Sequence, residues 1–241
     1  MSLPIEPAEG PAAPAPPDQP RIARSTVRDT WKWMWPDTAF RLLPFALATT
    51  VYAWFWGGKA AGIGLTAAYL PRDLLIGTAV GLPLAGLAAL FRRWVAPGYR
   101  LPTRADQIVQ TVFYFALNAP IEELFWRGMW QTLAVRAAAV PLGAGAAASA
   151  VGWAVATAIF GVYHRLGRWS WRSIAGVTAA GGVFGLAYLL QPTPRSIWLP
   201  TIIHAFATAG FLSWGDAALY LWDTRSRRMT KRNRIQRGGD T

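Results

Sequence analysis

Ionisable residues stand inside three otherwise apolar stretches of this 241-residue chain. The segment NAPIEELFWRGMW (118–130) carries two adjacent carboxylates and an arginine. The only two histidines close the segment FGVYH, at His164, and interrupt the segment LPTIIHAFAT, at His204. An ionisable side chain within a lipid bilayer costs about 3 kcal/mol on insertion scales, so it usually faces a cavity and serves a function. We therefore predict that these residues form a functional site.

The spacing within the first stretch gives its two carboxylates different roles. Glu123 and Arg127 are four residues apart with the acid first, which is the favourable order for a pair on one helix face. Neighbouring helical residues point about 100° apart, so Glu122 is predicted to face elsewhere and to stay unpaired. Pro120 lacks an N–H and suits a first helical turn, so we expect a helix or a helix break to begin there. A structural ion pair beside a rim carboxylate is the non-catalytic alternative.

The two histidines are predicted to lie on helices. Phe160 and His164 share a helix face by their spacing of four residues. Pro200 indicates a helix start, and His204 follows about one turn later on a strongly apolar surface, with Thr208 one turn beyond it. One histidine at a helix end is more often interfacial than catalytic. Two histidines in apolar helices favour a site in which His204 faces the interior.

One carboxylate and two imidazoles support two kinds of hydrolysis. A Glu/His/His set can bind Zn²⁺ with an open position for water. Alternatively, Glu122 can take a proton from water while an imidazole orients that water or stabilises an oxyanion. The chain has no HExxH, no GxSxG and no cysteine, so zincin-type, serine and cysteine mechanisms have little support. A proton relay in a transporter would use the same residue types.

The composition is typical of a membrane protein. Hydrophobic residues make up 53% of the chain and charged residues 15%, whereas soluble domains carry about 25% charged residues. No stretch alternates with the period of two that a β-barrel requires. We predict an all-α, polytopic transmembrane helical bundle of about six spans, each about 20 residues long. The predicted spans are 38–57, 73–91, 105–135, 143–164, 173–190 and 197–222, with 60–70 interfacial or re-entrant.

The basic residues are distributed as in a membrane protein rather than a nucleic-acid-binding protein. The net charge is +12, but no aromatic-interleaved basic groove is present, so nucleic acid is not predicted as a partner. The basic clusters flank apolar stretches, which is the pattern of the positive-inside rule and of contact with anionic lipids. We expect a multi-pass protein of a bacterial inner membrane with both termini cytoplasmic. The clusters are 21–32, 92–104, 165–172 and 225–237.

The chain divides into three parts. Residues 1–30 are rich in Pro and Ala and are expected to form a disordered arm, without the features of a signal peptide. Residues 31–222 form the transmembrane domain, and residues 223–241 form a basic cytoplasmic tail. Tryptophans near the ends of the apolar stretches are expected to form interfacial belts; they are Trp31, Trp33, Trp35, Trp169 and Trp171.

The segments EELFWR, FGVYH and HAFAT resemble, in this order, the three motifs of the CAAX prenyl protease and bacteriocin-processing (CPBP) family of intramembrane proteases. Those motifs are EExxxR, FxxxH, and a His followed four residues later by Asn or Asp. The resemblance covers residues 112–211, including GLAYLLQPTPRSIWLPTIIHAF. It implies an intramembrane endopeptidase that acts on a protein or peptide at the lipid bilayer.

The resemblance also implies roles for the site residues. Glu122 would be the general base that activates water, assisted by His164, while Glu123 with Arg127 would brace the site and His204 would help to hold the oxyanion. We favour the metal-free glutamic mechanism, because one carboxylate and two histidines, with no further carboxylate to hydrogen-bond the histidine ligands, would hold zinc weakly. Zn²⁺ held by Glu122, His164 and His204 is the alternative.

Two features set this chain apart from a simple match. Thr208 stands where the family has Asn or Asp, and a hydroxyl is shorter than an amide and offers one donor. A non-proteolytic protein of immunity or chaperone type on the same scaffold is therefore an alternative.

In addition, if 173–190 spans fully, His164 and His204 start near opposite membrane faces. They meet only if the helices tilt or the turn at 192–200 dips inward.

Overall fold

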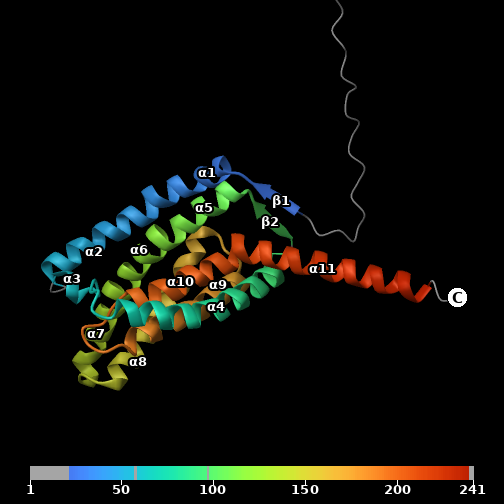
Figure 1. Cartoon of the computed structure of the whole chain (residues 1–241). Coiled ribbons are helices and arrows are strands. Elements are labelled where there is room, and N and C mark those ends of the chain that lie inside the picture. Colours follow the sequence, from blue (N-terminus) through green and yellow to red (C-terminus); the bar gives the residue numbers. More distant parts are fainter. Residues whose placement is uncertain (1–21, 57–58, 97, 239–241) are drawn as a thin grey trace, which may run out of the picture.

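The computed structural model describes residues 22–56, 59–96 and 98–238, and it is a helical bundle (Figure 1). In this part of the chain the backbone passes six times between the two ends of the bundle. The all-α prediction is confirmed. The first pass consists of α1 (Val27–Asp37), the π-helical segment η1 (Thr38–Leu42) and α2 (Leu43–Phe55). The second pass is α4 (Leu70–Val95), and it follows the short α3 (Lys59–Gly62).

The third pass is one uninterrupted run of helical residues. It consists of α5 (Arg104–Phe113), η2 (Tyr114–Asn118), α6 (Ala119–Glu123), η3 (Leu124–Gln131) and α7 (Thr132–Leu142). The later passes are α8 (Ala146–Tyr163) with the 3₁₀ turn η4 (His164–Gly167), α9 (Trp171–Leu189), and α10 (Trp198–Phe211) continued by α11 (Ser213–Gly238).

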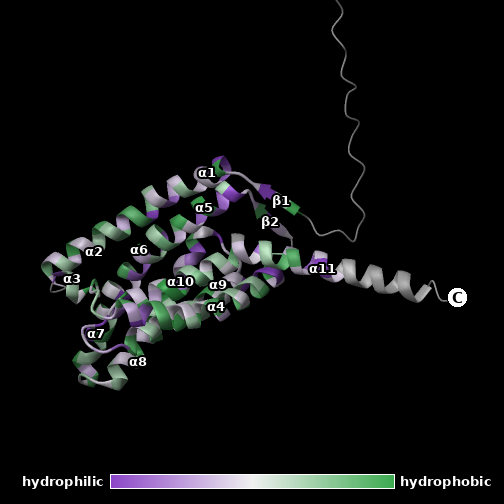
Figure 2. Ribbon diagram, in the orientation of Figure 1, coloured by the Kyte–Doolittle hydropathy of each residue, from purple (hydrophilic) through white to green (hydrophobic). Residues whose placement is uncertain are grey.

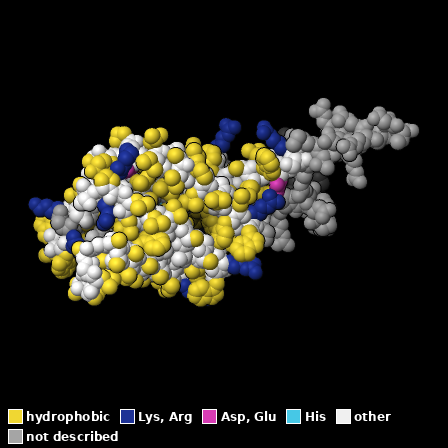
Figure 3. Space-filling model, turned by 90° about the horizontal axis from the view of Figure 1, so that it is seen from below, with side chains coloured by type: hydrophobic (Ala, Val, Ile, Leu, Met, Phe, Trp, Pro, Cys, Tyr) yellow, Lys and Arg dark blue, Asp and Glu magenta, His cyan; other side chains and the backbone are white. Residues whose placement is uncertain are grey.

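The outside of the bundle is apolar, as expected for a protein surrounded by lipid. Figure 2 shows hydrophobic residues along α2 and α4, and Figure 3 shows hydrophobic side chains over much of the visible face. Among the described residues, three helices are long and apolar enough to cross a membrane: 70–95, 146–167 and 171–189. The chain is therefore an integral membrane protein. The third pass is long as well, but it carries Glu122, Glu123 and Arg127 in its middle.

A small parallel sheet, which the sequence did not predict, closes one end of the bundle. Strand β1 (Ile22–Ser25) pairs with β2 (Tyr99–Pro102) at the end from which α11 continues (Figure 1). Thr26 caps α1 through a capping box with Asp29. Ordered structure therefore begins inside the segment 1–30 that was predicted to be a disordered arm, so its boundary at residue 30 is wrong. Residues 1–21 lie outside the described residues.

The arginine clusters near 92–104 and 165–172 lie at this same end. Arg92 binds Asp216 at 3.3 Å, which ties α4 to α11. Trp169, in the second cluster, stacks on Phe211 at the end of α10 with ring centroids 6.1 Å apart. Two basic loops therefore share one end of the bundle with its first and last elements, as an even number of passes requires. The membrane side on which this end lies stays a prediction.

The proline in the third pass lies in the first turn of α6, which confirms the predicted helix start or break near Pro120. Pro120 lies inside the helical run, directly after the π-turn η2. The N–H of Ala119 bonds to the carbonyl of Tyr114, five residues back. A proline ring collides with the carbonyl four residues before it in a regular α-helix, and a widened π-turn relieves this crowding without ending the helix.

Candidate functional site

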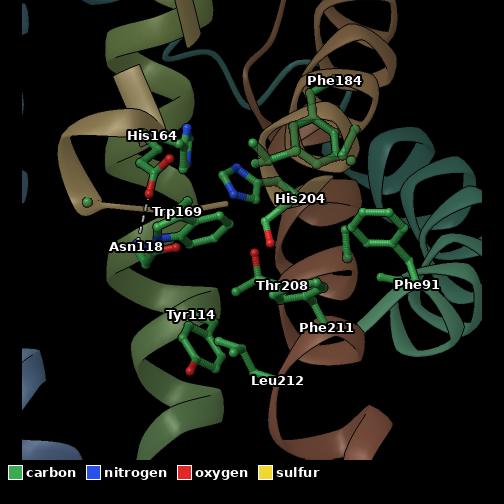
Figure 4. A pocket seen from close by; sticks show the side chains of 18 of the residues that line it. Phe91, Tyr114, Asn118, His164, Trp169, Phe184, His204, Thr208, Phe211 and Leu212 are labelled. Carbon is green, nitrogen blue, oxygen red and sulfur yellow. Dashed lines mark hydrogen bonds between the residues drawn. The ribbon is translucent and has the colours of Figure 1, made fainter. Parts of the chain in front are cut away.

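A cavity of about 790 Å³ lies inside the bundle, and Glu122, His164 and His204 all line it. His164 and His204 face each other across this space, and Thr208 lies one turn from His204 on the same wall (Figure 4). The rest of the wall is mainly aromatic and aliphatic. The structure thus gathers the three residues proposed for catalysis around one hollow, although they come from α6, η4 and α10.

Glu122 is buried, with 4% of its surface exposed. It was predicted to be unpaired, but it has hydrogen-bond partners. Its Oε1 accepts a hydrogen bond from Asn118 Nδ2 at 3.0 Å and another from the guanidinium of Arg41. Asp37 in turn holds Arg41 with two contacts of 2.6 Å, at Nε and Nη2. Glu122 is paired because a buried carboxylate needs a cation or hydrogen-bond donors to offset its lost hydration.

Glu123 is fully buried and binds two cationic or polar partners. Its Oε2 accepts from Arg127 Nε at 3.1 Å, which confirms the predicted pair. Its Oε1 contacts His204 Nδ1 at 2.8 Å, a contact that the sequence did not predict. Arg127 also donates to the Gly181 carbonyl at 3.0 Å and lies over the ring of Phe160. Glu123 thus connects the arginine brace to one of the two histidines.

Both imidazoles are oriented in the same way. His164 Nδ1 lies 2.8 Å from the carbonyl oxygen of Phe160, which can only accept, so Nδ1 is the donor. His204 Nδ1 likewise faces a carboxylate. The ring of Phe160 packs against both imidazoles, with its centroid 4.8 Å from His164 and 6.5 Å from His204. Each ring therefore has Nε2 left for chemistry in the cavity.

The two histidines meet because the turn before α10 dips inward. His204 is the seventh residue of α10, about 9 Å along the helix from its start. That start is itself deep, since Ile197 is fully buried and its N–H donates to the Gly64 carbonyl at 3.0 Å. On the other side, Trp169 packs on His164 with ring centroids 5.1 Å apart and folds the η4 turn over the cavity.

The residues of the cavity do not fit a divalent metal well. Within the described ranges, no group of three His, Asp or Glu side chains could hold a metal ion. The Arg41 guanidinium occupies Glu122 Oε1, and its positive charge would oppose a nearby dication. One premise of the sequence argument is wrong, however, because Glu123 does supply a carboxylate partner for His204. It is Arg41, bound to Glu122, that makes this cavity unfavourable for zinc.

Three residues that contact Glu122 or hold its partner were missed from sequence: Asp37, Arg41 and Asn118. A signal for all three of them existed. Arg41 is a cation close to the start of the predicted span 38–57, and Asp37 precedes it by four residues, the spacing of a same-face pair. Asn118 stands four residues before Glu122 in the same way.

Comparison with known families agrees with the three motifs. The model for the family of type II CAAX prenyl endopeptidases, Rce1-like, matches residues 104–210. This range contains Glu122, His164, His204 and Thr208, but it leaves out Arg41 and the whole first pass. No curated protein and no solved structure matches the chain.

Proposed function

Since residues 104–210 match the family of type II CAAX prenyl endopeptidases, Rce1-like, we propose that the chain is an intramembrane endopeptidase that hydrolyses a peptide bond of a membrane-associated protein or peptide. The observation that carries this proposal is the shared cavity of Glu122, His164 and His204 inside a membrane bundle. The family description names prenylated substrates. A cavity with mainly apolar walls beside the polar cluster suits a substrate with an apolar chain next to its scissile bond.

Glu122 acts as the general base in this proposal. Both of its hydrogen bonds within the described part of the chain are accepted by Oε1, which leaves Oε2 to bind and deprotonate water. With the Nδ1–H of His164 bound to the Phe160 carbonyl, Nε2 accepts a hydrogen bond from the other O–H of that water and orients it. The water oxygen then adds to the carbonyl carbon while its proton moves to Glu122.

His204 stabilises the oxyanion that forms in this step. It does so as an imidazolium, which donates Nε2–H to the oxyanion while Nδ1–H stays on Glu123. As the C–N bond breaks, Glu122 returns its proton to the leaving nitrogen, and the products are a carboxylic acid and an amine. No metal takes part in this scheme.

The test is cleavage by the purified protein in detergent or lipid nanodiscs. Peptides with and without a prenylated cysteine are incubated with it, and new termini are identified by mass spectrometry. Glu122→Gln is expected to lower the rate by at least about 100-fold, with the elution profile and helical circular dichroism unchanged. A Gln variant that cuts as fast as wild type would show that Glu122 is not the base. A wild-type protein that produces no new termini from any substrate would favour a transporter or a non-proteolytic scaffold.

A further inference from the structure

Arg41 reaches the predicted base from outside the three motifs and outside the family match. It lies in η1 of the first pass, 81 residues before Glu122, and its side chain is about one-fifth exposed. Nε and Nη2 contact the two oxygens of Asp37 at 2.6 Å each, and Nη1 donates to Glu122 Oε1. Such a two-point contact fixes the plane of a guanidinium. All three residues line the cavity.

The backbone around Arg41 has the same irregularity as the rest of the site. Three segments of the described chain are π-helical: 38–42, 114–118 and 124–131. Each one supplies a hydrogen-bond donor to the paired carboxylates, namely Arg41 and Asn118 to Glu122 and Arg127 to Glu123. π-Turns are rare, and they occur frequently at functional sites because the extra residue redirects the side chains that follow. The π-turn in the first pass belongs to this pattern.

We propose that Arg41, held by Asp37, is a positioning residue for the base Glu122, so that the active site includes the first pass as well as the three motifs. This inference rests on the proposed protease function. Arg41 and Asn118 hold Oε1 and thereby direct Oε2 toward the water. Without Arg41, two carboxylates, Asp37 and Glu122, would face the same cavity with no cation between them. Their repulsion would turn Glu122 away from the water.

The test compares Arg41→Ala with a matched control at the other end of the same helix pair. Arg136 also joins the first and third passes, by donating to the Tyr52 hydroxyl and the Trp56 carbonyl at 3.2 Å each, but it is not among the cavity residues. Arg41→Ala is expected to lower kcat by about 10- to 100-fold, the usual cost of losing a partner that orients a site residue, with KM changed by less than about threefold. Arg136→Ala should keep wild-type kcat.

Chemical rescue separates positioning from damage to the fold. Guanidinium at tens of millimolar, far below the concentrations of about 1 M and more that unfold proteins, should raise kcat of Arg41→Ala severalfold and leave wild type unchanged. Arg41→Lys should retain more activity than Arg41→Ala, because it keeps the charge. If Arg41→Ala does not fold, Asp37→Asn replaces it, with an expected fall in kcat of about threefold or more.

The outcomes distinguish this inference from the proposed function. Wild type and Glu122→Gln are measured in the same assay, and an inactive wild type refutes the protease proposal itself. If wild type is active and Glu122→Gln is not, wild-type kcat in Arg41→Ala, or in a folded Asp37→Asn, overturns the positioning role. Higher activity in Arg41→Ala also overturns it, since Arg41 would then restrain the base.

Discussion

The isosteric change of Glu123 to Gln is expected to destabilise the protein, whereas the same change at Glu122 is not. Glu123 is fully buried, and its two oxygens serve two donors, Arg127 Nε at 3.1 Å and His204 Nδ1 at 2.8 Å. An amide has one acceptor oxygen and one NH₂ group. Glu123→Gln therefore turns one of these contacts into a clash of two donors and leaves Arg127 without its carboxylate.

The magnitude follows from the burial of the pair. Both Glu123 and Arg127 have fully buried side chains, and removal of one partner of such a pair costs about 3 kcal/mol or more. In a chain of this length, about 3 kcal/mol corresponds to a fall in Tm of about 6–12 °C. At Glu122, a Gln oxygen can still accept from Arg41 and Asn118, and Asp37 still neutralises Arg41. The expected cost there is below about 1 kcal/mol.

The measurement is thermal unfolding of the two variants and wild type in the same detergent, followed by circular dichroism at 222 nm. The two substitutions have the same chemistry at adjacent positions, so each is the control for the other. Equal Tm values for wild type and Glu123→Gln would refute the stabilising role that we assign to the contacts of Glu123 with Arg127 and His204. A larger fall for Glu122→Gln than for Glu123→Gln would mean that the roles of the two carboxylates are reversed.

Thr208→Asn introduces, at the cavity wall, one of the two side chains that the family motif has at this position. It should raise kcat, because the shorter Thr hydroxyl is expected to bind the oxyanion more weakly than an amide. A fall in kcat would show that the Thr208 hydroxyl is itself the hydrogen-bond donor to the oxyanion. Cleavage is expected to continue in 1,10-phenanthroline as it does in the non-chelating 1,7-isomer. Loss of activity in the chelator alone, with recovery on addition of Zn²⁺, would contradict the metal-free mechanism.

The sequence predicted which residues line the shared cavity better than it predicted their contacts. Ionisable side chains in apolar stretches pointed to Glu122, His164 and His204, because burying such groups in lipid is costly wherever they lie in the chain. The same local reasoning identified the pair of Glu123 and Arg127, since four residues on a helix bring two side chains together. Both predictions depend only on the local sequence around each residue.

Contacts between distant segments could not be predicted in this way. The bond between Arg41 and Glu122 joins residues 81 positions apart, and the contact of His204 with Glu123 spans the same separation. Nothing in helical periodicity selects which passes become neighbours. The π-turns were not predicted either, because helical periodicity does not show where a turn widens. The parallel pairing of 22–25 with 99–102 is a third long-range contact.

His164 and His204 line the same cavity because of contacts between distant parts of the chain. By length alone, a full pass from Trp171 to Leu189 would carry the chain away from His164 before α10 begins. The chain returns because the α9–α10 turn is anchored inside the bundle, where Gln191 Nε2 donates to the Ser196 carbonyl at 2.6 Å and Ile197 bonds to Gly64. Since α10 starts inside the bundle rather than at its end, two helical turns are enough to bring His204 beside Glu123. The depth of that turn thus gives Glu123 its second partner and sets the orientation of the imidazole that we propose as the oxyanion donor.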